Sequence, residues 1–309
     1  MFYLVHDPED FESISDKIVP FFKESNFTLL ATPISENFEP EQDSVIVSYL
    51  PDNNFKKLLS KVIENEWNLA ILPHNKAPKT NKGFGINGKM EEAAKDVIEN
   101  DAITELDMLY CNDIPVLQSV KIGDVFIFSE EKLTKGFLLE VFYFLKNIRK
   151  LPELSHRSFH LSADEEQIIH TSAIGIIAVE HPSASVISSR WIENDLINDG
   201  KFQALILAPQ NIFQLLVFLF KSLIPNQRSS SKLPSFIGHI KTSNLKITNE
   251  TLIDFSIDGE KLKAENIELQ VHQKEIKLHQ KSNYIVKYDG TDPKKSLKID
   301  KLPTGEKRE

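Results

Sequence analysis

The run from residue 44 to residue 73 constrains the fold more than any other part of the sequence. Its two ends, Ser44–Tyr49 and Trp67–Pro73, are rich in apolar and β-branched residues, as buried strands are. Between them the apolar residues recur at helical spacing: Phe55, Leu58, Leu59, Val62 and Ile63. A strand, a helix and a strand in this order form a βαβ unit, so we expect the two strands to be parallel.

The loops after these two strands are where a ligand is expected. In open α/β sheets, ligands bind beside the carboxyl ends of the strands. Leu50–Asn54 follows the first strand, and His74–Asn81 follows the second. Asn53 or Asn54 is also a suitable N-cap for the helix that comes next.

Composition narrows the class of protein. The 309 residues are enough for two domains of about 100–200 residues each. A formal net charge of −9, without a basic stripe, argues against nucleic-acid binding. The single cysteine, Cys111, excludes an intramolecular disulfide and fits a reducing cytoplasm. No apolar run reaches the roughly 20 residues that cross a bilayer, so we expect no transmembrane segment.

The pattern of predicted elements changes near residues 100–106. Before that point, strands alternate with helices; the additional ones are predicted at 2–5, 8–25, 28–31 and 89–100. Pro20 predicts a kink or an early end in the first of these helices. From residue 106 onward, short strands are predicted in close succession: 106–110, 116–122, 125–128, 158–161, 168–180, 236–248, 252–257, 265–271 and 275–279. Two apolar helices, 131–150 and 211–224, interrupt them.

Residues 44–86 resemble the nucleotide-binding core of the diacylglycerol kinase and sphingosine kinase family, which shares its fold with NAD kinases. That family has a GGDGT loop after one strand and a PxGTxNDxAR loop after the next. Asp52 falls on the Asp of the first motif. Pro73, Ala77, Gly85 and Ile86 agree with the second loop and the segment after it. The order of predicted elements follows the family over almost the whole chain.

The resemblance implies a fold of two parts. We expect an N-terminal Rossmann-like parallel α/β domain over residues 1–103, like that of NAD kinases and diacylglycerol kinases. A β-sandwich-like, β-rich domain should follow over residues 104–290, with a late helix able to pack back on the first domain. Residues 291–309 should form a charged tail or linker.

The glycines of the first loop are replaced by Leu50, Pro51 and Asn53, and Asn75–Lys76 stands where the second loop has Gly-Thr. Glycines let backbone N–H groups close on a phosphate, and proline has no N–H to donate. The nucleotide site is therefore expected to be degenerate. If it still binds a nucleotide, the resemblance places five residues around it: Asp52, Asn53, Asn54, Asn75 and Lys76.

The resemblance also implies residues for catalysis. Asp258-Gly259-Glu260 matches a D-G-E motif whose Asp is taken as the general base on a lipid hydroxyl, with Glu260 as its supporting carboxylate. An Asp-Gly pair between strands is equally a hairpin signal, so a structural role is the alternative. Asp107 matches an Asp that helps hold Mg²⁺; here the alternative is a solvated carboxylate at a strand end.

Two further groups of residues bear on ligands. Lys76, Lys79 and Lys82 make the second loop basic, which suits either a different anion or a solvated loop. No zinc site is expected, because the histidines considered show no paired spacing: His170, His181, His239, His272 and His279.

Three hypotheses for function remain. The first is a catalytically impaired or inactive lipid-kinase-like domain with a binding or regulatory role, no cofactor, and a lipid or small anion as ligand. The second is an active ATP- and Mg²⁺-dependent kinase that phosphorylates a lipid hydroxyl. The third is the soluble part of a larger protein attached to a membrane beyond residue 309, because residues 302–309 resemble a linker. The expected location is the cytoplasm or the cytoplasmic face of a membrane.

Overall fold

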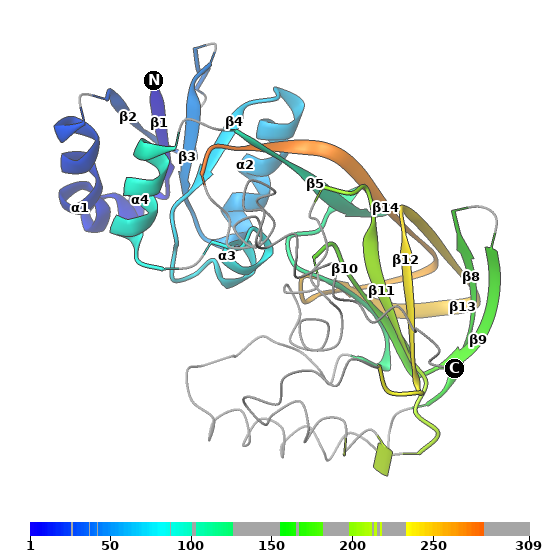
Figure 1. Cartoon of the computed structure of the whole chain (residues 1–309). Coiled ribbons are helices and arrows are strands. Elements are labelled where there is room, and N and C mark those ends of the chain that lie inside the picture. The colour runs from blue at the N-terminus through cyan, green and yellow to red at the C-terminus, as the bar shows by residue number, and fades with distance from the viewer. Residues whose placement is uncertain are drawn as a thin grey trace, which may run out of the picture.

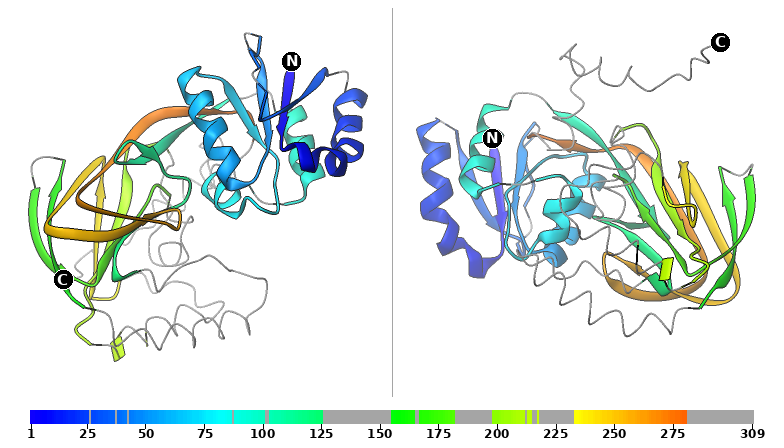
Figure 2. Two further views of the ribbon diagram at one scale, coloured as in Figure 1. Left: turned by 180° about the vertical axis from the view of Figure 1, so that it is seen from behind. Right: turned by 60° about the horizontal axis from the view of Figure 1, so that its bottom comes forward.

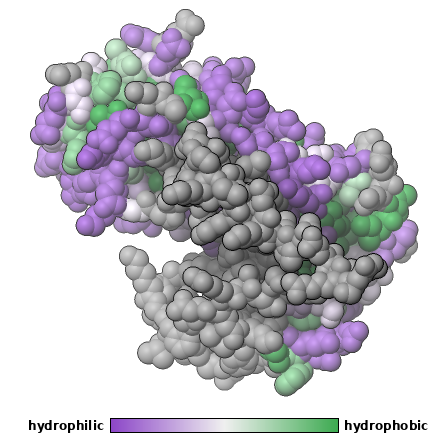
Figure 3. Space-filling model, viewed as in Figure 1, coloured by the Kyte–Doolittle hydropathy of each residue, from purple (hydrophilic) through white to green (hydrophobic). Residues whose placement is uncertain are grey.

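The described strands of this protein form one mixed sheet, accompanied by few helices. The computed structural model describes residues 1–280 apart from 26, 37, 42, 87, 101–102, 126–154, 165–166, 182–197, 212, 215–216 and 218–232. Within this part of the chain, a 14-stranded sheet runs through the whole molecule. The helices gather at one end and the antiparallel strands at the other (Figures 1 and 2). The helix-bearing end is mostly hydrophilic on the face shown in Figure 3.

The N-terminal part alternates strands with helices, as the sequence predicts. Its strands are β1 (Phe2–His6), β2 (Leu29–Pro33), β3 (Val45–Tyr49) and β4 (Asn68–Ile71), and all pair in parallel in the order β4-β3-β1-β2. Its helices are η1 (Pro8–Asp10), α1 (Phe11–Glu24), α2 (Asp52–Glu64), α3 (Pro78–Gly83) and α4 (Met90–Glu99). The predicted βαβ unit is β3-α2-β4, and its two strands are parallel.

Alternating residues of β3 pack against helices on opposite faces of the sheet. Val45 and Val47 belong to one buried cluster with side chains of α1 and α4. Ile46, between them, belongs to another cluster with side chains of α2. Because successive side chains of a strand point to opposite faces, a strand without polar interruptions must be covered on both sides.

Helix α1 runs to Glu24, close to its predicted end, with Pro20 inside it. One local expectation in this part was wrong: helix α2 has Pro51 as its N-cap, not Asn53 or Asn54, and begins at Asp52. The Pro51 carbonyl accepts the backbone N–H groups of Asn54 (3.0 Å) and Phe55 (2.9 Å), so the helix begins two or three residues earlier than the side-chain pattern suggested.

From residue 104 onward, the elements whose bounds the structure gives are all strands. These are β5 (Thr104–Cys111), β6 (Ile114–Pro115), β7 (Val120–Gly123), β8 (Arg157–Ala163), β9 (Gln167–Ala173), β10 (Gly175–Val179), β11 (Phe202–Leu207), β12 (Ile237–Thr242), β13 (Asn244–Ile257) and β14 (Glu260–Leu278). They pair antiparallel with one another. The predicted helix at 131–150 lies outside the described residues, as does most of the one at 211–224.

Strand boundaries here differ from the prediction in several places. Residues 116–119 are not part of the strand predicted over 116–122; β7 starts only at Val120, because the preceding backbone turns toward the β13–β14 hairpin. The strand predicted over 168–180 is divided into β9 and β10. The last two predicted strands belong to a single long strand, β14.

Strand β14 joins the two parts into one sheet. It forms a hairpin with β13, pairs with β5, and ends parallel to β4, where Leu278 is opposite Leu69. Just beyond it, the Gln280 side chain accepts the Ile71 N–H (2.5 Å) and donates to the Ile71 carbonyl (3.0 Å). Figure 1 shows β14, in orange, running between the helices and the antiparallel strands. The division into domains at residue 103 stays a prediction.

No described helix is long and apolar enough to cross a bilayer.

Candidate functional site

Polar side chains from three loops meet at the carboxyl ends of β1, β3 and β4. The Asn54 amide donates from Nδ2 to Asp7 Oδ2 over 2.8 Å. Nε2 of the buried His74 side chain lies 3.1 Å from Asp10 Oδ2. Tyr49 packs edge-on against His74, with 4.5 Å between ring centroids. Loops that are distant in sequence thus contact one another at the edge of the sheet where the βαβ unit predicts a ligand.

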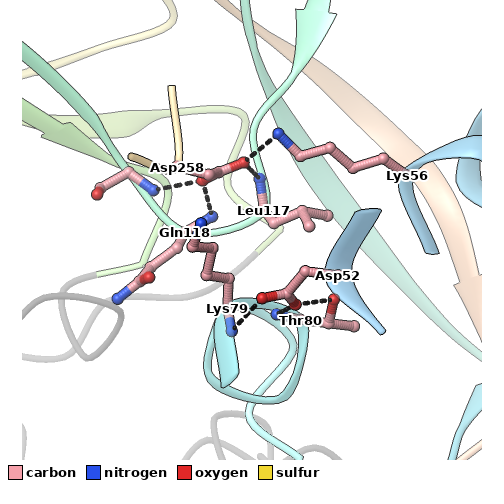
Figure 4. A network of polar contacts seen from close by, with 8 residues as sticks. Asp52, Lys56, Lys79, Thr80, Leu117, Gln118 and Asp258 are labelled. Atoms are coloured by element: carbon pink, nitrogen blue, oxygen red, sulfur yellow. Dashed lines mark hydrogen bonds and ion pairs between the residues drawn. The ribbon is translucent and has the colours of Figure 1, made fainter. Parts of the chain in front are cut away.

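Asp52 lies at this edge and holds the start of helix α3. Its Oδ1 accepts the backbone N–H of Thr80 (2.9 Å) and the Thr80 hydroxyl (2.8 Å), and its Oδ2 accepts the Lys79 N–H (3.3 Å). The first amides of a helix have no partner within the helix, and a carboxylate there is electrostatically favourable. Asp52 therefore acts as a cap for α3, although it belongs to α2 (Figure 4).

Other backbone amides of the two loops also have protein acceptors. The Asp52 N–H donates to the Lys76 carbonyl (3.2 Å), and the Ala77 N–H donates to the His74 carbonyl (3.1 Å). The Lys76 N–H donates to His74 Nδ1 (3.0 Å). Together with the amides that bind Asp52, five N–H groups of this edge are engaged.

The residues at this edge do not fit a triphosphate held by backbone amides. Such a cradle needs several N–H groups that point at the phosphate. Leu50 is buried here, and Pro51 has no N–H. Of the predicted nucleotide-binding residues, Asp52 is buried and Asn54 is half-buried, whereas Asn53, Asn75 and Lys76 are exposed.

Asp258 occupies the tight turn between β13 and β14. It has a φ of 51° and Gly259 one of 85°, which are the left-handed conformations that an Asp-Gly hairpin turn requires. The hairpin expected from this pair of residues is confirmed. Glu260, the first residue of β14, is exposed.

The Asp258 carboxylate is buried and has four donors. Oδ1 accepts the backbone N–H groups of Gln118 (2.7 Å) and Ser119 (3.1 Å). Oδ2 accepts the Leu117 N–H (3.0 Å) and lies 2.9 Å from Lys56 Nζ. Figure 4 shows these contacts converging on the carboxylate from the 117–119 loop and from α2. A general base must reach the proton that it removes, and both oxygens are already engaged.

Helix α2 therefore contacts two neighbouring segments of the chain through side chains on one of its faces. Asp52 and Lys56 are four residues apart, so their side chains lie on the same side of the helix. Asp52 binds α3, and Lys56 binds Asp258. Helix α3 also contacts the 117–119 loop: a Cβ added to Gly83 would lie 1.8 Å from the Leu117 carbonyl oxygen. We call α3, the first turn of α2, the 117–119 loop and the β13–β14 turn the junction.

Asp107, the residue predicted to help hold Mg²⁺, is buried on β5. Its Oδ1 accepts the Lys274 N–H (2.9 Å) and its Oδ2 accepts the Gly200 N–H (2.6 Å). In the part of the chain that the structure describes, no group of three or more His, Cys, Asp or Glu side chains is placed to hold a metal ion. Asp107 is thus not a solvated strand-end carboxylate, because it is buried and two backbone amides donate to it. Its part in holding Mg²⁺ stays a prediction.

Glu180, at the end of β10, is a buried carboxyl that the sequence did not bring to attention. Burial raises its pKa well above the ordinary value, and the charges of Asp107 and Asp199 raise it further. Among the described residues, its Oε1 has no hydrogen-bond partner. The signal in the sequence is slight: a glutamate directly after the apolar strand Gly175–Val179.

Comparison with known proteins supports the fold. No family model matches this chain, and no curated protein matches it in sequence. Its structure is similar to that of a candidate diacylglycerol kinase from Bacillus anthracis str. Sterne, with a TM-score of 0.66 and 19% identity over 91% of this chain and 97% of that one. It is also similar to a diacylglycerol kinase from the same organism, with a TM-score of 0.63 and 16% identity over 91% and 96% of the two chains. The resemblance in fold inferred from the sequence is confirmed, and at these identities it extends to the fold alone.

Proposed function

We propose that this chain, which has the fold of the diacylglycerol kinases, is a lipid-kinase-like domain that binds a ligand without transferring phosphate from ATP. The observation that carries the proposal is that both carboxylate oxygens of Asp258 already have donors within the protein. Three backbone N–H groups and the Lys56 ammonium surround the carboxylate that the resemblance would make the general base. To accept a proton from a lipid hydroxyl, Asp258 would first have to lose contacts that hold the junction together.

The edge where a nucleotide would sit supports the same proposal. Its amides donate to Asp52, His74 and Lys76, and no glycine remains in Leu50–Asn54. The proposed function therefore involves neither ATP nor Mg²⁺.

A small anion or an anionic lipid headgroup is the ligand class that we propose for this edge. Lys76 is exposed on the second loop, and Lys79 follows it at the start of α3. Lysine ammonium groups can bind an anion with side chains where backbone amides are engaged. Exposed Asn53 and Asn75 supply further donors at the same edge.

The direct test is a pair of measurements on the wild-type chain. Calorimetry with ATP and Mg²⁺ should show no binding at micromolar concentrations, and diacylglycerol phosphorylation should stay at the level of a protein-free control. Nucleotide binding together with phosphorylation that Asp258→Asn abolishes, while this variant keeps the fold by circular dichroism, would establish the active-kinase alternative instead.

The ligand class needs a separate test. Titration with inorganic phosphate, and sedimentation with vesicles containing phosphatidic acid, distinguish a free anion from a headgroup. Lys76→Gln should weaken whichever binding is observed, whereas Lys95→Gln, on the exposed face of α4, should not. Binding that is equally strong in both variants would exclude the second loop as the site.

A further inference from the structure

Two histidine side chains face each other on the hairpin of β8 and β9. The two strands are antiparallel, and His160 lies directly opposite His170 in their register. The two Nδ1 atoms are 2.8 Å apart, and the ring planes are inclined by 82°. Both side chains are exposed. No spacing of the usual metal-ligand kind links them in the sequence, because the hairpin and not a helix or a short loop brings them together.

The two rings are hydrogen-bonded through Nδ1, and this separation also matches one coordination geometry. If both nitrogens bind one metal ion at the usual distance of about 2.0–2.1 Å, they subtend an angle of about 85–90° at the metal. Tetrahedral coordination would instead need nitrogens about 3.3 Å apart. An angle near 90° is that of neighbouring ligands in square-planar or octahedral complexes, which Cu²⁺ and Ni²⁺ form readily with imidazole.

The packing and pairing of the strands fix the positions of His160 and His170. Phe159 and Leu161, on either side of His160, are buried in the core of the antiparallel strands. Strand β8 is also paired with β13 on its other side, with His160 opposite Thr248. A site built on paired strands keeps its ligands in position better than one built on a loop, because the backbone cannot easily shift.

The surroundings leave room for water to complete the coordination. Residues of a strand alternate between its faces, so Ser158 and Ser162 share the outward face with His160, and Ser172 shares it with His170. Ser158 and Ser172 are exposed, and Ser162 is half-buried. The charged group nearest in register on this face is Lys246 of β13, opposite Ser162, and its ammonium is paired with Glu268 at 3.4 Å.

We propose that His160 and His170 form a binding site for one Cu²⁺ or Ni²⁺ ion, held through Nδ1 of both rings and by water at the remaining positions. The site lies at the opposite end of the molecule from the helices (Figure 1). It is independent of the proposed lipid-kinase-like function.

The test uses tag-free protein titrated with CuCl₂ in the presence of glycine, which competes for loosely held copper. We expect one Cu²⁺ per chain, bound roughly tenfold or more tightly than by His160→Gln or His170→Gln, since each variant keeps only one of the two nitrogen ligands. His272→Gln, on β14, removes a partly exposed histidine outside the pair and should leave the affinity unchanged. Paramagnetic resonance should show two equatorial nitrogens in the wild-type protein.

Thermal unfolding gives a second readout, because a ligand that binds only the folded state raises the melting temperature. Copper should raise it for the wild type and for His272→Gln, and much less for the two variants of the pair. The same affinity in the wild type and in both pair variants would mean an adventitious ion only and would overturn the proposal. Absence of binding to the wild type would do the same.

Discussion

Lys56 Nζ lies 2.9 Å from Asp258 Oδ2, and this ion pair connects helix α2 to the β13–β14 turn. The Asp258 side chain is 1% exposed and that of Lys56 is 24% exposed, so the carboxylate depends on protein donors. A buried charge that loses its partner is costly, whereas an exposed pair contributes little. The Lys56–Asp258 ion pair and the three backbone amides that donate to Asp258 together connect α2, the 117–119 loop and the β13–β14 turn.

We predict that Lys56→Met destabilises the folded protein by about 1–3 kcal/mol, because Asp258 keeps its amide donors but loses the only side-chain cation the structure gives it within the described residues. Urea denaturation followed by fluorescence measures the loss. Lys57→Met, on the exposed face of the same helix, is the matched control and should change stability by less than about 0.5 kcal/mol. Equal stability of the two variants would mean that the pair does not hold the junction.

The cap that Asp52 provides for α3 leads to a second prediction. Asp52→Ala leaves the amides of Lys79 and Thr80 and the Thr80 hydroxyl without their acceptor, and should cost about 1.5–3 kcal/mol. Hydrogen exchange of those two amides should become faster even under conditions where the whole protein stays folded. Asn53→Ala, at the next and exposed position, serves as control. Unchanged protection at residues 79 and 80 would contradict the capping role.

The contact between α3 and the 117–119 loop is close enough to require glycine. In Gly83→Ala the new Cβ would meet the Leu117 carbonyl oxygen at 1.8 Å, so backbone must move, at a cost of about 1–3 kcal/mol or more. Gly238→Ala adds the same methyl group where the nearest atom, on Ile206, is 3.3 Å away, and should cost less. Comparison of the two midpoints in urea checks this; an equal loss would show that the contact is not tight in solution.

Cys111 should be unreactive in the folded protein. Burial raises the pKa of its thiol to about 12, with a further contribution from the charge of Asp258. Since the thiolate is the reactive form, modification by a disulfide reagent at pH 8 should be slow and should follow unfolding. The rate in urea, compared with the fraction unfolded, measures this. Fast labelling without unfolding would mean that the thiol is accessible.

Glu180 should make stability depend on pH. Because its pKa is raised in the folded state, the folded protein retains this proton at pH values where the unfolded chain has released it. This group therefore lowers stability progressively as the pH rises above about 4.3, the ordinary glutamate value, until the folded pKa is reached.

Glu180→Gln removes this loss of stability at rising pH, because glutamine has no carboxyl group but nearly the same shape. The variant should equal the wild type near pH 4 and become increasingly more stable by comparison at pH 6 to 8, as measured by urea denaturation across the range. Glu99→Gln, an exposed glutamate on α4, should show no such divergence. A difference between Glu180→Gln and wild type that is constant with pH would contradict the raised pKa.

Local pattern was enough to predict the βαβ unit, the hairpin at Asp258-Gly259 and the change near residues 100–106 from alternating strands and helices to closely spaced strands. In each case the information lies in residues close together in the chain: the period of apolar side chains, or a pair of turn residues. The places where local pattern failed are equally instructive. Residues 116–119 have the composition of a strand, yet the amides of residues 117–119 donate to a carboxylate 139 to 141 residues away.

The sequence by itself determined the order of elements, the parallel core and the loss of glycine from both loops, because these are properties of single segments. Only the tertiary structure decided that Asp52 caps a different helix, that four donors surround Asp258, and that His160 meets His170. Each of these depends on where two distant segments lie in space. A side chain acquires its chemical role from the donors and acceptors within about 3 Å of it, and the packing of segments, not their spacing along the chain, sets those neighbours.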